Sequence, residues 1–156
     1  MIEITIPGMD KLIIKHLVCD VNGTLAMDGE LLPGVAERIH SLKKFLEIHL
    51  ITANTNGRQA EIDEVLGTKA ILLAPGAEAG QKAAYLRSLG ANHCAAIGQG
   101  ANDQSMLKEA ALGICVLSPE GTFGPTLLSA DVVFSDILTA LDLFEHPNRM
   151  IATLRQ

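Results

Sequence analysis

The sequence has little positive charge for its length. Its 156 residues include 12 lysines and arginines against 18 aspartates and glutamates, which gives a formal net charge of -6 at neutral pH. This balance provides no electrostatic reason to expect binding to nucleic acid or to an anionic membrane surface. A neutral or cationic partner, or a divalent metal ion, fits the charge better.

Long apolar runs are also missing. Every apolar segment is far shorter than the roughly 20 residues that a membrane span needs. The N-terminus, with Glu3, lacks the pattern of a secretory signal. We therefore expect a cytoplasmic protein that does not enter a membrane.

Cysteine and histidine are too few and too scattered to form familiar motifs. The three cysteines are widely spaced, and each lies in an apolar run, which favours buried thiols over a disulfide framework or a CxxC knuckle. The five histidines show no ligand spacing such as HExxH. Spacing alone therefore assigns no metal to any of them: His16, His40, His49, His93 and His146.

Short apolar runs alternate with segments of helical period along the whole chain. This alternation is typical of parallel strands joined by crossover helices, so the sequence predicts an α/β fold with a mainly parallel sheet and helices on both faces. The length suits one ordinary domain, and no repeat, linker or low-complexity segment divides it. We expect a single domain over residues 1–156.

The apolar runs predict strands at residues 12–19, 48–52, 69–74, 93–98, 112–117 and 131–134. A strand at residues 2–6 is expected to form a β-hairpin with residues 12–19, because a turn-like segment, "PGMD", separates them. Helices are expected at 33–45, 57–66, 77–90, 102–111, 123–129 and 136–144, with a final turn or helix at 149–154. Ser135 is expected to cap the helix that starts at residue 136.

Polar side chains gather where these strands end. The ligand crevice of an open parallel sheet lies outside the carboxyl ends of the strands. Four groups fall at or near such ends: Asp20 with Asn22, Thr52 with Asn54, Lys82 at a helix start, and Gln99 with Asp103. Their chemistry suits a phosphoryl group, because a carboxylate can attack phosphorus, a hydroxyl can donate to its oxygens and a lysine can neutralise growing charge.

Four motifs, in order, resemble the haloacid dehalogenase (HAD) superfamily, and within it the phosphorylation domain of P-type ATPases. The segment "DVNGTLA" is similar to the motif DxxGTLT, and "LITAN" to the strand end that carries TGD. The segment "GQKAAYLRSLG" resembles the lysine helix of that family, and "GQGANDQSM" resembles its GDGxND loop. The resemblance covers residues 17–144 and implies a three-layer, Rossmann-like core.

The resemblance implies a covalent mechanism. Asp20 would be the nucleophile that becomes an aspartyl phosphate. Thr52 and Lys82 would hold the phosphoryl oxygens, and Asp103 would orient Lys82. Contacts to a phosphorylated substrate would come from the glycine-rich turns and strand ends, at Gly23, Thr24, Ala53, Asn54, Gly100 and Asn102. Gly23 and Gly100 would also let backbone amides approach the anion closely.

The resemblance also implies a magnesium ion. Asp20, the backbone carbonyl of Asn22 and the side chain of Gln99 would hold it, with Asp103 in the surrounding shell. In the family pattern the position of Gln99 is an aspartate, and TGD likewise has become "TAN" here. Mg²⁺ favours carboxylates, so a neutral amide in this position predicts weak binding of the ion.

Asn22 is a second departure with a chemical consequence. HAD phosphatases carry an aspartate there, which protonates the leaving group and then activates water, and Asn22 can do neither. P-type pumps carry threonine at this point and still form a phosphoenzyme, so Asn22 does not forbid phosphorylation. It predicts poor general acid catalysis, a loss of about 10² to 10⁴ in rate where that role is needed.

No segment of the sequence is long enough for a cap or nucleotide-binding domain. Only a short stretch separates Asp20 from the helix at Pro33, and a helix and a strand already fill the interval from Thr52 to Lys82. The expected site is uncapped, so either a large substrate reaches it directly or neighbouring subunits of a homo-oligomer form its roof. Without a membrane span, ion transport is excluded.

Simpler interpretations exist for single residues. Asp20 could be only a turn residue after a strand, and Lys82 is marked by spacing alone, with Gln81 as the alternative if the register shifts by one. The segment "GAEAGQK" is not a P-loop, and "GQGAND" lacks the GxGxxG of nicotinamide-binding turns.

Two functions fit the sequence. The first is a Mg²⁺-assisted phosphohydrolase or phosphotransferase that works through Asp20. The second is a binding or regulatory module whose pocket survives after the loss of catalysis, as the amides at Asn22, Asn54 and Gln99 suggest. The enzyme is favoured, because the residues for covalent chemistry remain while those that tune rate and metal affinity are altered.

Overall fold

A six-stranded parallel sheet forms the middle layer of the molecule. The computed structural model describes all residues 1–156, and the strand order across this sheet is β10-β9-β8-β3-β6-β7. Its strands are β3 (His16–Asp20), β6 (Glu47–Thr52), β7 (Ile71–Leu72), β8 (Cys94–Gly98), β9 (Leu112–Val116) and β10 (Val132–Phe134). β3 is the first of these strands in the chain and lies between β6 and β8. The next two strands, β6 and β7, lie on one side of it, and the last three, β8, β9 and β10, lie on the other.

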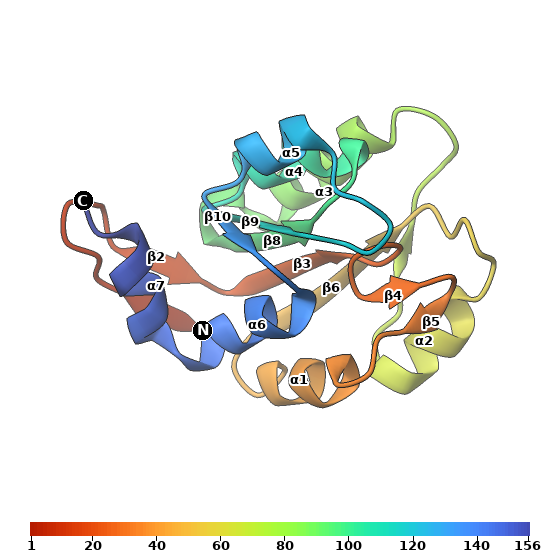
Figure 1. Cartoon of the computed structure of the whole chain (residues 1–156), viewed down its shortest axis with the longest axis horizontal. Helices are drawn as coiled ribbons and strands as arrows, with labels where there is room; N and C mark the ends of the chain where they lie inside the picture. Colours follow the sequence, from red (N-terminus) through yellow and green to blue (C-terminus); the bar gives the residue numbers. More distant parts are fainter.

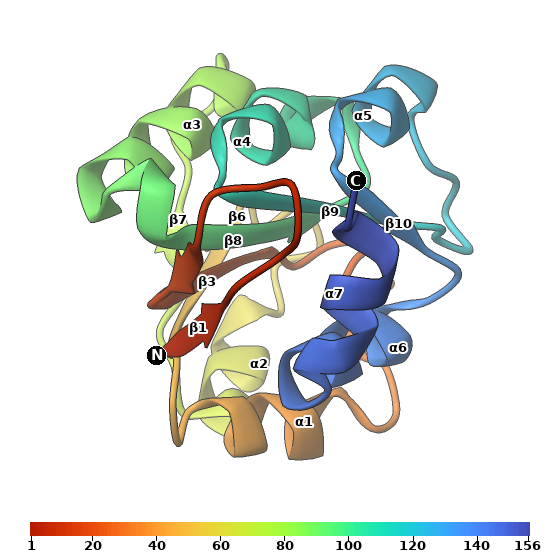
Figure 2. The ribbon, with the colours of Figure 1, turned by 90° about the vertical axis from the view of Figure 1, so that its left-hand side faces the viewer.

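Helices cover both faces of the sheet (Figures 1 and 2). One face carries α3 (Glu78–Leu89), α4 (Gln104–Glu109) and α5 (Gly124–Ser129), and the other carries α1 (Val35–Leu42), α2 (Gln59–Leu66), α6 (Ile137–Asp142) and α7 (Pro147–Leu154). The three-layer α/β architecture predicted from the sequence is therefore confirmed. None of the helices is long and apolar enough to cross a membrane.

The alternation of side chains along β3 explains why both faces are covered. Leu17 and Cys19 point into the larger of two apolar cores, whereas Val18 packs into the smaller one. All three are fully buried, as expected for a central parallel strand whose two faces are both apolar. The three cysteines are free and buried, as the sequence predicts.

The N-terminal hairpin is confirmed in part. β1 (Ile2–Ile4) pairs antiparallel with β2 (Leu12–Ile14), but the expected strand 12–19 is divided at Lys15. Lys15 N–H donates to the carbonyl of His93 at 2.9 Å, and Lys15 C=O accepts from Glu47 N–H at 3.0 Å. The backbone therefore leaves the hairpin and enters the main sheet at this residue.

Several local expectations are wrong in detail. Asp136, and not Ser135, caps α6, because its carboxylate accepts from Thr139 N–H at 2.8 Å. The expected strand 69–74 pairs only at Ile71–Leu72, and a short antiparallel pair, β4 (Ala26–Met27) with β5 (Glu30–Leu31), was not predicted. Figure 1 shows β4 and β5 beyond the end toward which β3 points.

Candidate active site

A cleft of about 370 Å³ opens at the carboxyl ends of β3, β6 and β8. Because β3 lies at the point where the chain order reverses across the sheet, this is where α/β sheets of this kind bind ligands. Asp20 is the last residue of β3 and lines the cleft with 5% of its surface exposed. The other lining residues come from the turns after the three strands: Asn22, Ala53, Thr55, Gln99, Gly100, Ala101 and Asn102.

Lys82 reaches Asp20 from α3 and is fully buried. Its Nζ lies 2.6 Å from Asp20 Oδ1 and 2.6 Å from Asp103 Oδ1, with Asn102 Oδ1 at 3.3 Å. The three protons of the ammonium group thus face three oxygen acceptors, which is what a buried lysine requires. Gln81, the alternative to Lys82, bonds only the backbone of Ala74 and Gly76 and lies outside the site.

Burial and neighbouring charge set the ionisation of this group. Burial alone would lower the pKa of Lys82, but Asp20 and Asp103 outweigh it and the pKa is raised, so Lys82 is an ammonium ion at neutral pH. Burial, followed by the charge of Asp103, raises the pKa of Asp20 to about 7, although Lys82 and Thr24 oppose this. Two carboxylates share one lysine, so a cation in the cleft would favour ionised Asp20.

Asp103 connects the loop after β8 to Lys82. Its Oδ2 accepts from the N–H groups of Gln99 and Gly100, both at 2.9 Å, while its Oδ1 faces Lys82. A Cβ at Gly98 would lie 2.4 Å from Asp103 Cγ, so a side chain there would displace the carboxylate. Asp103 has no exposed surface and does not line the cleft, so its geometry is that of a positioning residue.

Thr24 and Thr52 contact the site differently. Thr24 Oγ1 donates to Asp20 Oδ2 at 2.9 Å, so each oxygen of Asp20 has one protein partner. Thr52 does not line the cleft; its Oγ1 accepts from Asn22 Nδ2 at 3.1 Å and from Asn54 N–H at 3.0 Å. Both acceptor directions of the Thr52 hydroxyl are thus filled, and the buried side chain links the turns after β3 and β6.

Gln99 lies directly over the turn after β3. Its Nε2 is 3.5 Å from the backbone carbonyl of Asn22, and a Cβ at Gly23 would come within 2.2 Å of the same nitrogen. Gly23 also has a φ of 79°, a conformation that favours glycine. The close approach of Gln99 to the turn therefore depends on glycine at position 23.

The oxygen donors of the cleft fit Mg²⁺. Asp20, Asn22 and Gln99 line the same cleft and can offer one carboxylate, one backbone carbonyl and one amide oxygen, and Mg²⁺ commonly takes one or two carboxylates and keeps several waters. Gln99 presents its nitrogen to the Asn22 carbonyl, so an ion at this point requires the amide to turn.

The predicted substrate contacts divide into two sets. Ala53, Gly100 and Asn102 line the cleft, whereas Gly23 and Thr24 border a separate, mainly apolar cavity of about 500 Å³. Asn54 does not line the cleft, and its Oδ1 accepts from the N–H of Gln59, the first residue of α2, at 3.3 Å. Its φ of 53° places it in the left-handed region.

Sequence reasoning missed three residues at this site. Thr55 and Ala101 line the cleft, and Asn56 Nδ2 lies 3.4 Å from Asn22 Oδ1. The polar run "TANTNG" after β6 was the available signal, because a turn that leaves the carboxyl end of a strand must border the crevice.

Comparisons with known proteins agree with this architecture. No protein-family model matches the chain. Among curated proteins, MJ0073 of Methanocaldococcus jannaschii, whose name describes it as uncharacterised, is 53% identical over 60 residues, 38% of this chain and 64% of that protein. The likewise uncharacterised MJ0072 of the same organism is 42% identical over 40 residues, 26% of this chain and 91% of that protein. The chain thus spans less than two thirds of the first of these relatives.

Solved structures resemble nearly the whole chain. The 3-deoxy-D-manno-octulosonate 8-phosphate phosphatase of Moraxella catarrhalis, in complex with magnesium, phosphate and KDO, has a TM-score of 0.66 and 22% identity over 91% of this chain and 94% of its own. The cobalt-bound enzyme of Haemophilus influenzae has a TM-score of 0.66 and 17% identity over 90% and 89%. A phosphoserine phosphatase with an analogue of its phospho-aspartyl intermediate has a TM-score of 0.60 and 18% identity, over 85% of this chain and 99% of its own.

These similarities define the class of fold. The chain has the fold of the haloacid dehalogenase superfamily, in a form without a cap domain. The predicted resemblance to that superfamily is confirmed at this level.

Proposed function

We propose that this protein is a Mg²⁺-dependent phosphohydrolase that acts through an aspartyl phosphate at Asp20. The observation that carries the proposal is the position of Asp20, which borders an open cleft while its Oδ1 lies 2.6 Å from the ammonium group of the buried Lys82. A carboxylate that borders an open cleft, with a fixed cation beside it, is an arrangement suited to nucleophilic attack on a phosphate ester.

The chain's own residues account for the first step. An oxygen of Asp20 forms a bond to phosphorus while the bond from phosphorus to the leaving-group oxygen breaks, which leaves an acyl phosphate on Asp20 and the leaving group as an alkoxide or phenoxide that takes its proton from water. Lys82, beside Asp20, offsets the negative charge that grows on the phosphoryl oxygens, and Thr52 holds the Asn22 amide and the Asn54 N–H at the border of the cleft. Asp103 keeps Lys82 in place.

A bound magnesium ion would supply further charge neutralisation at the transferred phosphoryl group. Asp20, the Asn22 carbonyl and Gln99 are the residues that would hold it. Since Gln99 brings no charge, we expect the affinity for Mg²⁺ to be well below that of a site with a second carboxylate.

The second step, hydrolysis of the aspartyl phosphate, has no acid or base at position 22. Asn22 donates to Thr52 at 3.1 Å and is contacted by Asn56 at 3.4 Å, so its amide is a structural link and cannot carry a proton. The first step likewise has no acid at this position, so we propose slow formation of the aspartyl phosphate from esters with poor leaving groups and faster formation from aryl or acyl phosphates, whose leaving groups need no protonation.

The substrate reaches an open site. No segment forms a cap, and the β4–β5 pair is only a short hairpin near the cleft end of the sheet (Figure 1). We propose that the substrate is either a large phosphorylated molecule or a small one enclosed by a second copy of the chain. Nucleic acid is not proposed as a substrate, given the net charge of -6.

The test is turnover of para-nitrophenyl phosphate and acetyl phosphate with Mg²⁺. Wild-type protein is compared with Asp20→Asn, which keeps the size of the side chain and removes the nucleophile. We expect activity in the wild type alone. Equal turnover rates in the two proteins would contradict the proposal.

A second candidate is a binding or regulatory module with the same fold. The observation that favours it is the contact of Gln99 Nε2 with the Asn22 carbonyl at 3.5 Å, which places an amide where an ion would lie. The double variant Asn22→Asp with Gln99→Asp separates the two functions. If the machinery is only weakened, this variant gains activity, whereas no gain supports the binding module.

A further inference from the structure

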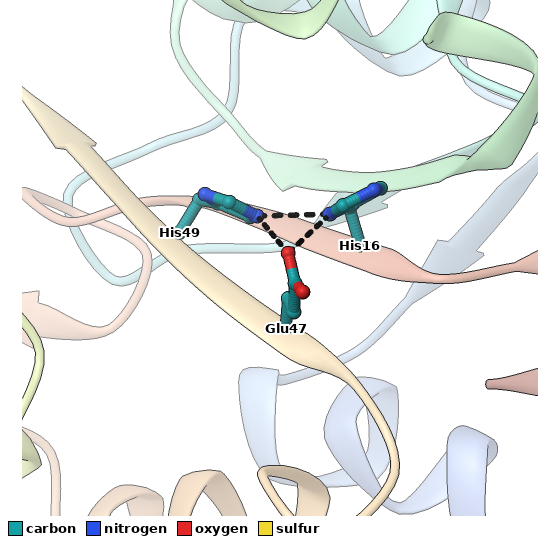
Figure 3. A group of neighbouring side chains, drawn as sticks. All are labelled: His16, Glu47 and His49. Atoms are coloured by element: carbon teal, nitrogen blue, oxygen red, sulfur yellow. Dashed lines mark hydrogen bonds and ion pairs between the residues drawn. The ribbon is translucent and has the colours of Figure 1, made fainter. Parts of the chain in front are cut away.

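Three metal-ligating side chains converge at the opposite end of the central strands. His16 opens β3, and Glu47 and His49 lie two residues apart on the neighbouring strand β6, so the last two share one face of the sheet. The register pairs His16 with Glu47 directly across the two strands. Figure 3 shows the three side chains pointing toward a common point.

The distances within this cluster are those of a coordination shell. His16 Nδ1 lies 3.1 Å from His49 Nε2 and 3.1 Å from Glu47 Oε2, and His49 Nε2 lies 4.0 Å from Glu47 Oε2. Two ligands of a tetrahedral Zn²⁺ ion are separated by about 3.3 Å, given metal–ligand bonds of about 2.0 to 2.1 Å. Two of the three edges already match this value, and the third involves the flexible side chain of Glu47.

A neighbouring hydroxyl group can hold His49 in the form that binds a metal. Tyr85, on α3, has its hydroxyl oxygen 2.9 Å from Nδ1 of His49. A tyrosine hydroxyl can accept a hydrogen bond from Nδ1–H, which leaves the lone pair of Nε2 directed at His16 and Glu47. Histidine ligands of zinc are commonly oriented by a partner on the other ring nitrogen.

The surroundings leave the carboxylate available. Glu47 forms no ion pair with any lysine or arginine; its contacts within 4.0 Å to basic groups are the two histidines. Its side chain is 73% exposed, whereas those of His16 and His49 are each 16% exposed. The two histidine ligands are therefore fixed by the packed sheet. The carboxylate of Glu47 reaches the same point from the exposed side, where water can complete the shell.

We propose that His16, Glu47 and His49 bind one Zn²⁺ ion or a similar first-row transition metal. Two imidazoles with one carboxylate suit such metals, whereas Mg²⁺ prefers sites made of oxygen alone. The site is separate from the phosphate cleft, since its ligands lie at the amino ends of β3 and β6 and Asp20 and Thr52 lie at the carboxyl ends. An ion here would cross-link the two strands that carry those residues.

The test is titration of metal-free full-length protein with Zn²⁺ by calorimetry in excess Mg²⁺. The Asp20→Asn variant is used as the background, so that binding in the phosphate cleft does not contribute. We expect one Zn²⁺ per chain, unaffected by Mg²⁺. Replacement by Co²⁺ should give the intense visible absorption of a tetrahedral site.

Four variants on this background locate the ion. His16→Gln and His49→Gln should weaken Zn²⁺ binding by about 100-fold, and Tyr85→Phe, which keeps all three ligands, by about 10-fold. Glu47→Gln changes an exposed side chain, so it tests the site without disturbing the fold and should also weaken binding by at least about 10-fold.

His40→Gln is the matched control, because His40 is exposed on α1 and belongs to no cluster. It should bind Zn²⁺ as its parent does. Absence of Zn²⁺ binding, or equal affinity in Glu47→Gln and His40→Gln, would overturn the proposal. In that case the 3.1 Å contact between the two rings is only a hydrogen bond.

Discussion

The raised pKa of Asp20 predicts that removing its charge makes the protein more stable. The pKa lies at about 7 in the folded chain against an ordinary value of 3.8. Because the folded state holds the proton more tightly, the stability that protonation provides is fully present below pH 3.8 and is lost as the pH rises to about 7. A difference of about three pH units corresponds to about 4 kcal/mol in total.

The side chain at position 20 of the variant Asp20→Asn cannot titrate. Position 20 therefore contributes no loss of unfolding free energy as the pH rises from 3.8 to about 7. Relative to the wild type, the variant should gain about 2 to 3 kcal/mol between about pH 5 and about pH 8. For a chain of this size, the melting temperature of Asp20→Asn should rise by about 5 to 10 °C relative to that of the wild type over the same pH range. The variant also leaves Lys82 paired with Asp103 alone, so the buried cluster becomes neutral.

Thermal and urea unfolding of both proteins in the presence of a chelator would measure this gain. Asp10→Asn is the control, because Asp10 is an exposed aspartate of the N-terminal turn. A difference between wild type and Asp20→Asn that does not change with pH would refute the reasoning, as would a variant that loses stability relative to the wild type as the pH rises. Added Mg²⁺ should stabilise the wild type more than the variant.

Three further changes test the surroundings of Asp20. Lys82→Met leaves two buried carboxylates without their cation and should cost about 3 to 5 kcal/mol of unfolding free energy at neutral pH, as measured by urea denaturation. Gly98→Ala forces a Cβ against the fixed Asp103 carboxylate and should cost about 1 to 3 kcal/mol in the same assay. Gln99→Asp adds a charged oxygen ligand and should raise Mg²⁺ affinity by about 10-fold in calorimetry. Unchanged stability in the first two variants, or unchanged affinity in the third, would contradict the described geometry.

The sequence predicted the sheet and the position of Lys82 for different reasons. Apolar runs such as "LVC" and "CAAI" have no alternation, which is what burial on both faces of a parallel sheet requires. For Lys82 the sequence offers only its spacing from the other motifs, because the surrounding helix has no strong local motif. Its contacts at 2.6 Å to Asp20 and Asp103 were beyond sequence reasoning, because they depend on how α3 packs on the sheet.

What the sequence could not predict depends on strand register and loop geometry. His16 and His49 are 33 residues apart, so no local spacing indicates that their rings meet. The β4–β5 pair is too short to give an apolar pattern, and the choice between Ser135 and Asp136 as the helix cap depends on backbone angles. The roles assigned to the cleft residues remain predictions, as does the resemblance to P-type ATPases in particular.

The most direct test of the central claim is calorimetry with Mg²⁺ and beryllium fluoride, which together mimic an aspartyl phosphate. Wild-type protein should bind the two jointly and tightly while binding Mg²⁺ alone only weakly, and Asp20→Asn should show no joint binding. Failure of the wild type to bind beryllium fluoride, or equal binding by Asp20→Asn, would contradict the assignment of Asp20 as the nucleophile.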